Sequence, residues 1–245
     1  MKSEWFKDWF NTKEYLNVYQ HRNESDAETH IKLILENVQI SSKANILDMA
    51  CGAGRHAIIL ARKDFNITAV DLSENLLSIA KKTAYEENLS INFIHSDIRN
   101  FNTTDKYNLV LNLFTSFGYF ETDEENYAVL QKAYDLLEDR GYFVLDFFNS
   151  QFLRQNLVEF SEENLSGAEI HQYRKIKDNR VTKKIAITKD GNVSTFEESV
   201  RMFTQDELFN TITKIGFDIY NTFGDFFGNE FDDFRSPRII LFCKK

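Results

Sequence analysis

A short apolar segment followed at once by a glycine-containing turn constrains this chain more than any other feature. Residues 45–49 (Asn-Ile-Leu-Asp-Met) are typical of a buried strand, and Gly52 and Gly54 precede a helical segment over residues 55–63. Glycine at such a turn lets the backbone approach a ligand closely, and the free N–H groups of the helix N-terminus favour polar or anionic groups. The loop from Asp48 to Gly54 is therefore the first candidate for a small-molecule site.

Two carboxylates stand at the ends of the next two predicted strands. A strand over residues 67–70 ends at Asp71, and a strand over residues 91–95 is followed closely by Asp97. In an open α/β sheet, ligands bind outside the carboxyl ends of the strands, where the strand order reverses. Asp71 can accept hydrogen bonds from both ribose hydroxyls, and Asp97 can accept one from an adenine amino group. Together the two residues indicate an adenosine site.

Strands and helices continue to alternate after Asp97. Residues 107–113 and 142–148 are apolar strands, and Thr122 with Glu125 forms a capping box that opens a helix between them. Gly141 is expected to end that helix in the C′ position. This alternation is typical of a doubly wound parallel sheet.

The last part of the chain has a helix followed by a hairpin. Thr204 and Glu207 form a second capping box, and Gly216 ends the helix that it opens. Residues 217–223 and 238–243 are predicted to close the sheet as a hairpin with a long loop. The predicted fold class is α/β: a Rossmann-like, seven-stranded, mostly parallel sheet with an antiparallel C-terminal hairpin strand.

Two segments flank this predicted sheet. The spacing of apolar residues over 1–40 favours helices, whereas residues 151–201 alternate polar with apolar side chains between turns at Asp178-Asn179 and Asp190-Gly191. The second pattern predicts an inserted antiparallel β meander, with the acidic residues at 159–163 in a solvated loop. We therefore expect a helical lid over residues 1–40, a Rossmann-like domain over 41–150 and 202–245, and a β cap over the acceptor site at 151–201.

The glycine loop alone does not identify the ligand. Residues 52–57 (Gly-Ala-Gly-Arg-His-Ala) also fit the pattern of dinucleotide-binding enzymes, with an acidic residue about 20 positions later. Three features favour a different adenosine-containing ligand: Asp48 before the glycines, Asp97 at the third strand, and the C-terminal hairpin. A nicotinamide-dependent oxidoreductase remains the alternative at this point.

These features together resemble class I S-adenosylmethionine (SAM)-dependent methyltransferases. Residues 46–56 (Ile-Leu-Asp-Met-Ala-Cys-Gly-Ala-Gly-Arg-His) resemble motif I, residues 68–73 resemble motif II, and residues 95–99 resemble the adenine-binding segment. Residues 113–120 and Ser236-Pro237-Arg238 resemble a bacterial small-molecule branch of that superfamily. The resemblance covers most of the chain after residue 40, and it implies SAM as cofactor and S-adenosylhomocysteine as product.

The resemblance also implies roles for individual residues. Asp48 and the backbone from Ala50 to Gly54 would hold the methionyl part of SAM, with Ala50 at a position where the family more often has Gly. The remaining expected cofactor contacts are Tyr15, Tyr19 and Arg22 at the carboxylate, Asp71 at the ribose, Leu72, Asp97 and Ile98 at the adenine, and Leu113 and Phe114 on the methyl-transfer side. The candidates to bind the acceptor are Tyr119, Asp146 and Asn149, near the ends of the fourth and fifth strands.

Composition narrows the class of acceptor. The net charge is −9, and the densest basic stretch, residues 174–184, is interrupted by Asp178. Because proteins that grip a nucleic acid backbone usually carry a basic patch or stripe, we expect a small-molecule acceptor and no nucleic acid. The five His residues lack a metal-ligand spacing, so no metal is expected. Cys51 and Cys243 predict a reduced, cytoplasmic protein, and no apolar run predicts a membrane span; the oligomeric state is expected to be monomer or homodimer.

Methyl transfer from a sulfonium needs alignment and dehydration more than a catalytic triad. The predicted function is transfer of a methyl group to a small-molecule N or O acceptor, with Cys51 as a packing residue and His56 as a satisfied polar residue on the first helix of the sheet. A SAM-binding module without enzymatic activity is a second hypothesis. A nucleic-acid methyltransferase is a weaker one, because Asn112 is followed by residues 113–115 (Leu-Phe-Thr) where adenine-amino enzymes have Pro-Pro.

Overall fold

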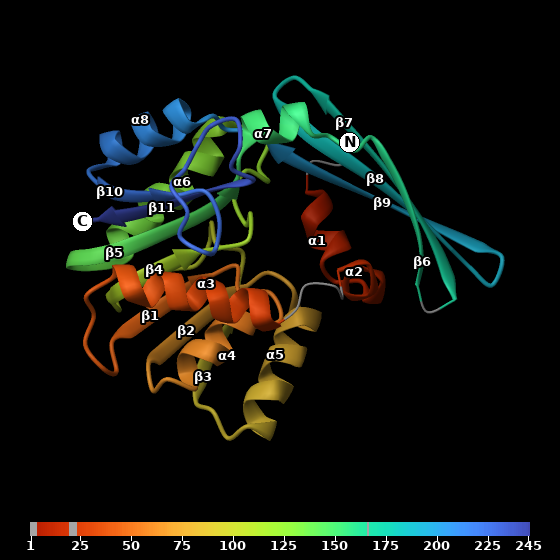
Figure 1. The fold of residues 1–245 in the computed structure, drawn as a ribbon. Coiled ribbons are helices and arrows are strands. Elements are labelled where there is room, and N and C mark those ends of the chain that lie inside the picture. Colours follow the sequence, from red (N-terminus) through yellow and green to blue (C-terminus); the bar gives the residue numbers. More distant parts are fainter. Residues whose placement is uncertain (1–3, 20–23, 166) are drawn as a thin grey trace.

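The computed structural model describes residues 4–19, 24–165 and 167–245, and a seven-stranded sheet is the centre of the molecule (Figure 1). The strand order is β10-β11-β5-β4-β1-β2-β3, and every pairing is parallel except those of β11 with its two neighbours. The strands are β1 (Asn45–Met49), β2 (Asn66–Asp71), β3 (Ile91–His95), β4 (Tyr107–Asn112), β5 (Leu137–Phe148), β10 (Asp218–Phe223) and β11 (Arg238–Lys244). The predicted fold class is confirmed. The order reverses between β1 and β4, which is where ligands bind in such sheets.

Helices cover both faces of this sheet because its central strands are apolar on both sides. On β4, Leu109 and Leu111 face one core cluster, whereas Val110 faces the other. We call the seven-stranded sheet and the helices around it the large domain. Its helices are α3 (Glu24–Asn37), α4 (Arg55–Ala61), α5 (Glu74–Glu86), α6 (Asp123–Leu136), α7 (Ser150–Gln155) and α8 (Gln205–Ile215). Both predicted capping boxes are present, at Thr122 and at Thr204.

One predicted helix end is wrong. The sequence places Gly141 just after α6, but α6 ends at Leu136 and Gly141 lies inside β5. The glycine is needed there for space: a Cβ atom would lie 2.9 Å from the Glu138 carbonyl oxygen and 3.2 Å from that of Tyr107. Neighbouring backbone atoms therefore leave no room for a side chain at residue 141. The helix ends at Leu136, five residues before the glycine that was predicted to follow its end.

A second sheet projects from the large domain (Figure 1). It is an antiparallel meander in the order β6-β7-β8-β9, with the expected turn at Asp178-Asn179, where both residues have positive φ. Its strands are β6 (Phe160–Leu165), β7 (Ala168–Lys177), β8 (Arg180–Lys189) and β9 (Asn192–Arg201). The prediction of a solvated loop at residues 159–163 is wrong, because β6 pairs with β7 there although its side chains remain largely exposed.

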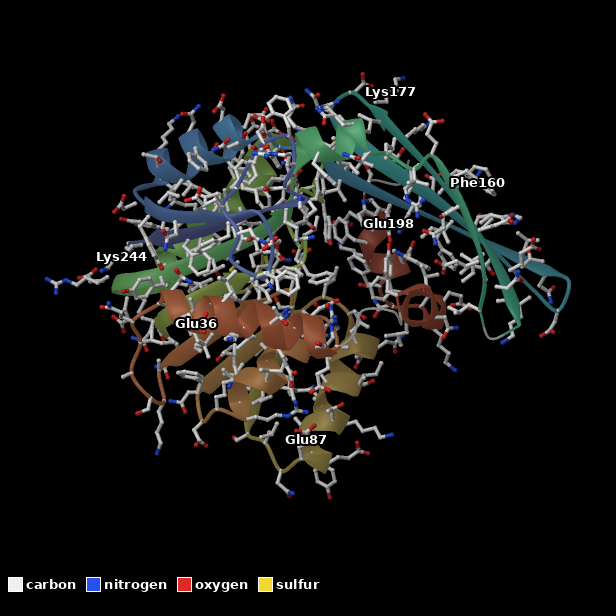
Figure 2. All side chains as sticks on the ribbon, viewed as in Figure 1. Glu36, Glu87, Phe160, Lys177, Glu198 and Lys244 are labelled. Carbon is white, nitrogen blue, oxygen red and sulfur yellow. The ribbon has the colours of Figure 1, made fainter. Side chains whose placement is uncertain are left out.

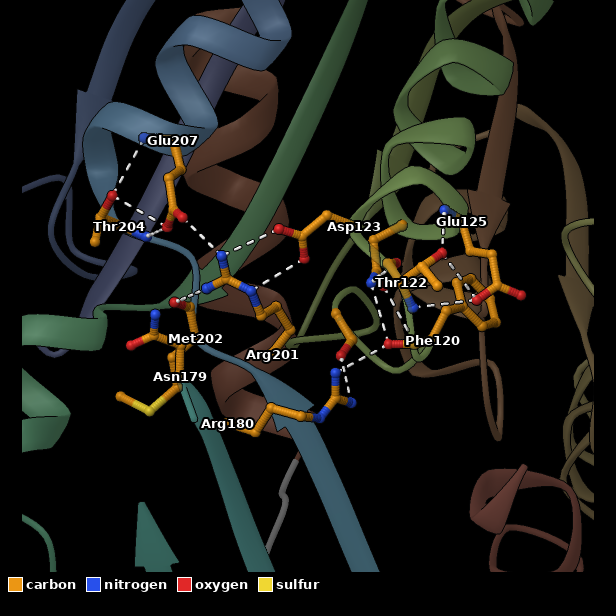
Figure 3. A network of polar contacts seen from close by, with 12 residues as sticks. Phe120, Thr122, Asp123, Glu125, Asn179, Arg180, Arg201, Met202, Thr204 and Glu207 are labelled. Carbon is orange, nitrogen blue, oxygen red and sulfur yellow. Dashed lines mark hydrogen bonds and ion pairs between the residues drawn. The ribbon is translucent and has the colours of Figure 1, made fainter. Parts of the chain in front are cut away.

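Two arginines fasten the base of the meander to the large domain (Figure 3). Arg201 donates to the carboxylates of Asp123 and Glu207, at the N-termini of α6 and α8. Arg180 donates to backbone carbonyls after β4, including that of Phe120 at 3.0 Å. The meander therefore rests on the loop between β4 and α6.

The two N-terminal helices, α1 (Trp5–Trp9) and α2 (Lys13–Val18), lie between the large domain and the meander (Figure 1). The aromatic side chains of α1 are buried against both neighbours: Trp5 packs edge-on to Tyr119, and Trp9 lies 4.3 Å from Phe196 between ring centroids. The helix pattern expected for residues 1–40 is confirmed in the described residues, but as three helices of which α3 packs on the large sheet. No helix among the described residues is long and apolar enough to cross a membrane.

Candidate functional site

A cavity of about 290 Å³ lies at the carboxyl ends of the central strands, close to the size range of small-ligand sites. Residues of the loops after β1, β2, β3 and β4 line it, together with residues of α1 and α2 and of the segments that follow these two helices. Most of the residues predicted from the sequence to bind the cofactor or the acceptor line this cavity: Tyr15, Tyr19, Asp48, Ala50, Gly52, Asp71, Leu72, Asp97, Ile98, Leu113, Phe114 and Tyr119. Gly54, Asp146 and Asn149 do not line it, and Arg22 lies outside the described residues.

The glycine loop has the backbone conformation that its sequence suggests. Ala50, Gly52 and Gly54 all have positive φ, at 62°, 57° and 78°. A Cβ atom on Gly52 would meet nothing within 4 Å, whereas one on Gly54 would lie 2.8 Å from Cβ of Ala80. Gly52 therefore keeps the cavity wall open, while Gly54 permits α4 to pack against α5.

Asp71 ties this loop to the end of β2. One carboxylate oxygen accepts from the Gly52 N–H and the other from the Ser73 N–H, each at 2.7 Å. Burial raises the pKa of Asp71, and these backbone hydrogen bonds oppose the rise. A carboxylate has about four lone-pair sites, so Asp71 retains acceptor capacity for a ligand hydroxyl.

Asp48 is a cavity residue whose carboxylate has one oxygen without a hydrogen-bond donor among the described residues. Its side chain is buried at the end of β1, and Oδ2 has no hydrogen-bond partner among the described residues. Burial, reinforced by the Asp71 charge and opposed by Arg55, raises the pKa of Asp48 to about 7. A buried carboxylate in this state favours a cationic hydrogen-bond donor in the cavity.

Asp97 already has a partner within the protein. Its Oδ1 accepts from the Arg99 backbone N–H at 3.0 Å, and its Oδ2 accepts from Arg99 Nη2 at 2.6 Å. Burial raises the pKa of Asp97, but the hydrogen bonds from Arg99 outweigh that effect and the pKa is lowered overall. Arg99 also donates to Glu4 at 2.8 Å, so the end of β3 is linked to α1.

Two of the three predicted acceptor residues support loops instead of lining the cavity. Asp146 is fully buried, accepts from the Phe114 backbone N–H at 2.8 Å and pairs with the Arg238 guanidinium. Asn149 donates to the carbonyl oxygens of Asp233 and Ser236. Both side chains are directed towards partners that are distant in sequence, so Tyr119 alone of the three stands in the cavity wall.

Sequence reasoning did not assign several other wall residues to the site. They are Phe6, Phe10, Leu16, Arg55, Val70, Leu76, Ser96, Ser116 and Phe120, together with His56, which is expected to have a structural role. Cys51 and Ala53 also line the wall, within the Ala50–Gly54 backbone that is expected to hold the methionyl part of the cofactor. The helical spacing of the N-terminal aromatics was visible, but not the surface that they cover. Burial raises the pKa of the Cys51 thiol well above its ordinary value, which supports the packing role. His56 Nε2 lacks a partner among the described residues, so this side chain is not the fully satisfied group expected.

Comparisons with known proteins agree with this geometry. Residues 46–141 match the family model described as a methyltransferase domain. The chain is 30% identical over 103 residues to dTDP-3-amino-3,4,6-trideoxy-α-D-glucopyranose N,N-dimethyltransferase from Streptomyces venezuelae, covering 42% of each chain. It is 29% identical over 104 residues to ubiquinone biosynthesis O-methyltransferase from Rickettsia felis, covering 42% of this chain and 43% of that protein. The chain thus spans less than half the length of these curated relatives.

The fold similarity extends over nearly the whole chain. A crystal structure of an S-adenosylmethionine-dependent methyltransferase from Clostridium acetobutylicum superposes with a TM-score of 0.81 at 20% identity, covering 94% of this chain and 96% of that one. The resemblance to class I methyltransferases is therefore confirmed for the fold, and residues 46–141 are the part of the chain that matches the methyltransferase family model.

Proposed function

We propose that the protein is a SAM-dependent methyltransferase that transfers a methyl group to an N or O atom of a small molecule. The observation that carries the proposal is the convergence of Asp48, Gly52, Asp71 and Asp97 on one cavity at the point where the strand order reverses. The names of the two curated relatives, an N,N-dimethyltransferase and an O-methyltransferase, support both acceptor classes.

The residues of the cavity fit SAM. In this proposal the unpartnered Oδ2 of Asp48 accepts from the methionyl ammonium, and the Ala50–Gly54 backbone lies along the methionyl chain. Asp71 accepts from the ribose hydroxyls through the lone pairs that Gly52 and Ser73 leave free. Tyr15 and Tyr19 line the cavity where the cofactor carboxylate would lie, and Tyr19 contacts it through its ring because its hydroxyl donates to Glu198. Arg22, predicted for the same role, lies outside the described residues.

The remaining contacts concern the adenine and the methyl group. Leu72 packs on the adenine, and the Ile98 N–H donates a hydrogen bond to the adenine edge. The Asp97 carboxylate accepts a hydrogen bond from the adenine amino group and also accepts from Arg99. Leu113 and Phe114 line the methyl-transfer side. The hydrogen bonds from Arg99 distinguish Asp97 from Asp48, whose Oδ2 has no protein donor among the described residues.

Catalysis then rests on alignment and on exclusion of water. When bound, SAM supplies a methyl group on an activated sulfonium, so the protein needs to hold the acceptor in line and keep the cavity dry. The aromatic rings of Phe6, Phe10, Tyr119 and Phe120 form a wall suited to that task. Tyr119 is the residue that we expect to contact the acceptor.

The proposed domains have corresponding roles. Residues 1–40 include the helices that close the cavity, residues 41–150 and 202–245 bind the cofactor, and residues 151–201 cap the acceptor side. The acidic net charge favours a small-molecule acceptor over nucleic acid. The two free, buried cysteines suit a cytoplasmic protein. The proposed oligomeric state is a monomer or a homodimer.

Calorimetric titration with S-adenosylhomocysteine tests the cofactor assignment. Wild type should bind, and Asp71→Asn should weaken binding about tenfold or more, because it removes the charge that receives two hydroxyl groups. Asp139→Asn, an exposed aspartate outside the cavity, is the control and should bind as wild type does.

Activity requires a separate measurement. Amine, carboxylate and phenol acceptors are screened with SAM for release of S-adenosylhomocysteine. Binding without turnover on any acceptor would favour a SAM-binding module, and absence of binding would sink the proposal.

A further inference from the structure

A partly buried cluster of charged and aromatic side chains joins the N-terminal helices to the meander. The carboxylate of Glu198 on β9 accepts hydrogen bonds from Trp9 Nε1 at 2.7 Å and from the Tyr19 hydroxyl at 2.5 Å. Its second oxygen lies 3.2 Å from Lys183 Nζ, which also donates to the Tyr19 oxygen. Glu198 stands beside α1 in Figure 2. One carboxylate thus holds groups from α1, from the end of α2 and from β8.

The register of the meander explains why these groups meet. Lys183 and Glu198 are directly opposite each other on neighbouring antiparallel strands, so their side chains share one face of the sheet. Phe196, two residues before Glu198, lies on the same face and packs against Trp9. The neighbouring pair, Lys184 and Glu197, is therefore on the opposite face, where Glu197 is exposed.

Burial makes this cluster stronger than an ordinary surface ion pair. The side chains of Lys183 and Glu198 are only 13% and 15% exposed. A pair with so little water contact is weakly screened, and loss of one partner leaves the other charge poorly solvated. The Lys183 ammonium also lies 4.5 Å from the centre of the Tyr19 ring, which restrains the ring itself.

Tyr19 is a wall residue of the cavity, whereas Glu198 and Lys183 are not. The same meander is fastened at its base to the loop that carries Tyr119, because the Arg201 backbone N–H donates to the Gly118 carbonyl oxygen at 2.8 Å. The meander therefore contacts two sides of the cavity, through Tyr19 at one and through the loop after β4 at the other.

We propose that Glu198 is a positioning residue for cofactor binding: together with Lys183 it holds the Tyr19 hydroxyl, so that the meander sets the N-terminal wall of the cavity. This inference rests on the proposed function. It assigns to the meander a part in cofactor affinity, beyond its expected part as a cap over the acceptor. By linkage, any factor by which an acceptor on the meander changes the cofactor affinity is also the factor by which the cofactor changes the acceptor affinity.

The test is a double-mutant cycle on the affinity for S-adenosylhomocysteine, measured by calorimetry. Glu198→Ala and Tyr19→Phe should each raise Kd about tenfold, since each removes one restraint on the same contact. The double variant should bind no more weakly than Tyr19→Phe alone, because Glu198 acts through Tyr19. Glu197→Gln, on the exposed face, is the matched control and should leave Kd unchanged.

A variant with an uncharged pair at these two positions distinguishes a loss of Tyr19 positioning from a loss of folding. Glu198→Gln combined with Lys183→Met keeps an acceptor for the Tyr19 hydroxyl and leaves no unpaired charge, so it should recover most of the affinity that Glu198→Ala loses. Fluorescence gives a readout of the cluster itself. The two Trp residues are Trp5 and Trp9, so in a Trp5→Phe background the emission of Trp9 should shift to the red when Glu198 is replaced by Ala.

The outcomes distinguish this inference from the function on which it rests. If wild type binds and the two losses in affinity multiply in the double variant, Glu198 does not act through Tyr19 and the inference is overturned. Wild-type affinity in Glu198→Ala overturns it as well. If wild type itself does not bind S-adenosylhomocysteine, the proposed function fails and the inference fails with it.

Discussion

The buried His30 should make the protein lose stability in mild acid. His30 lies on α3 with its side chain inaccessible to water, stacked 4.4 Å from the Phe226 ring, and neither ring nitrogen has a hydrogen-bond partner among the described residues. Asp146 is 4.0 Å away and paired with Arg238, and the His56 ring lies edge-on at 5.4 Å. Burial, with a smaller contribution from Arg238, lowers the pKa of His30 from 6.5 to about 3. His30 is therefore neutral at pH 7 and forms no ion pair with Asp146.

The sign and size of the effect follow from this shift. Above pH 6.5 the histidine is neutral in both the folded and the unfolded chain, so the free energy of unfolding does not depend on it. Between pH 6.5 and about 3, His30 is protonated in the unfolded chain but remains neutral in the folded chain. Each pH unit in this window lowers the free energy of unfolding by about 1.4 kcal/mol. At about pH 5 the loss from His30 alone is about 2 kcal/mol.

Urea unfolding of wild type and His30→Phe, followed by tryptophan fluorescence at about pH 7.5 and about pH 5, measures this loss. The variant removes the titrating group, so its stability relative to wild type should rise by about 2 kcal/mol on acidification, whatever the substitution costs in packing. Ile31→Val, a substitution at the neighbouring buried position of α3, is the control, because its difference from wild type should be the same at both pH values. A difference between His30→Phe and wild type that does not change with pH would refute the reasoning.

Three further predictions concern stability. Ala50→Gly should raise the free energy of unfolding by about 1 kcal/mol, because it relieves a side chain held at φ 62°; thermal unfolding checks this. Gly54→Ala should destabilise by about 2 kcal/mol or more, since its Cβ would collide with Ala80, whereas Gly52→Ala should cost about 1 kcal/mol of backbone strain only; equal losses in urea unfolding would contradict the packing argument. Arg201→Met should cost about 1–3 kcal/mol, because the carboxylates of Asp123 and Glu207, in the first turns of α6 and α8, lose their partner, and limited proteolysis should then cut the meander first.

The regular part of the site could be predicted because it depends on local sequence. The strand, turn and helix around Gly52 follow from short-range preferences, and the carboxyl ends of parallel strands meet at one edge whatever the rest of the chain does. Asp48, Asp71 and Asp97 therefore line the same cavity, as expected. Backbone geometry alone brings them together.

Whether Asp48, Asp146 and Asn149 have protein partners was decided only by the tertiary structure, whereas the partner of Asp97, Arg99, is two residues away in sequence. Asp146 and Asn149 are also at a strand end, but Arg238 and the loop after β10 engage them, and those partners are about 90 residues away in sequence. Asp97 is held by Arg99, whereas Asp48 keeps an oxygen without a partner among the described residues. A carboxylate alone in sequence looks the same in each of these cases.

The sequence by itself thus determined the alternating fold, the glycine loop and the row of carboxylates, because each depends on residues close together in the chain. The tertiary structure decided that Asp146 and Asn149 turn to partners outside the cavity, and it supplied the wall from α1 and α2 with Tyr19 held by Glu198. The physical reason is that a buried polar group must find a partner, and the partner is chosen by packing between segments far apart in sequence.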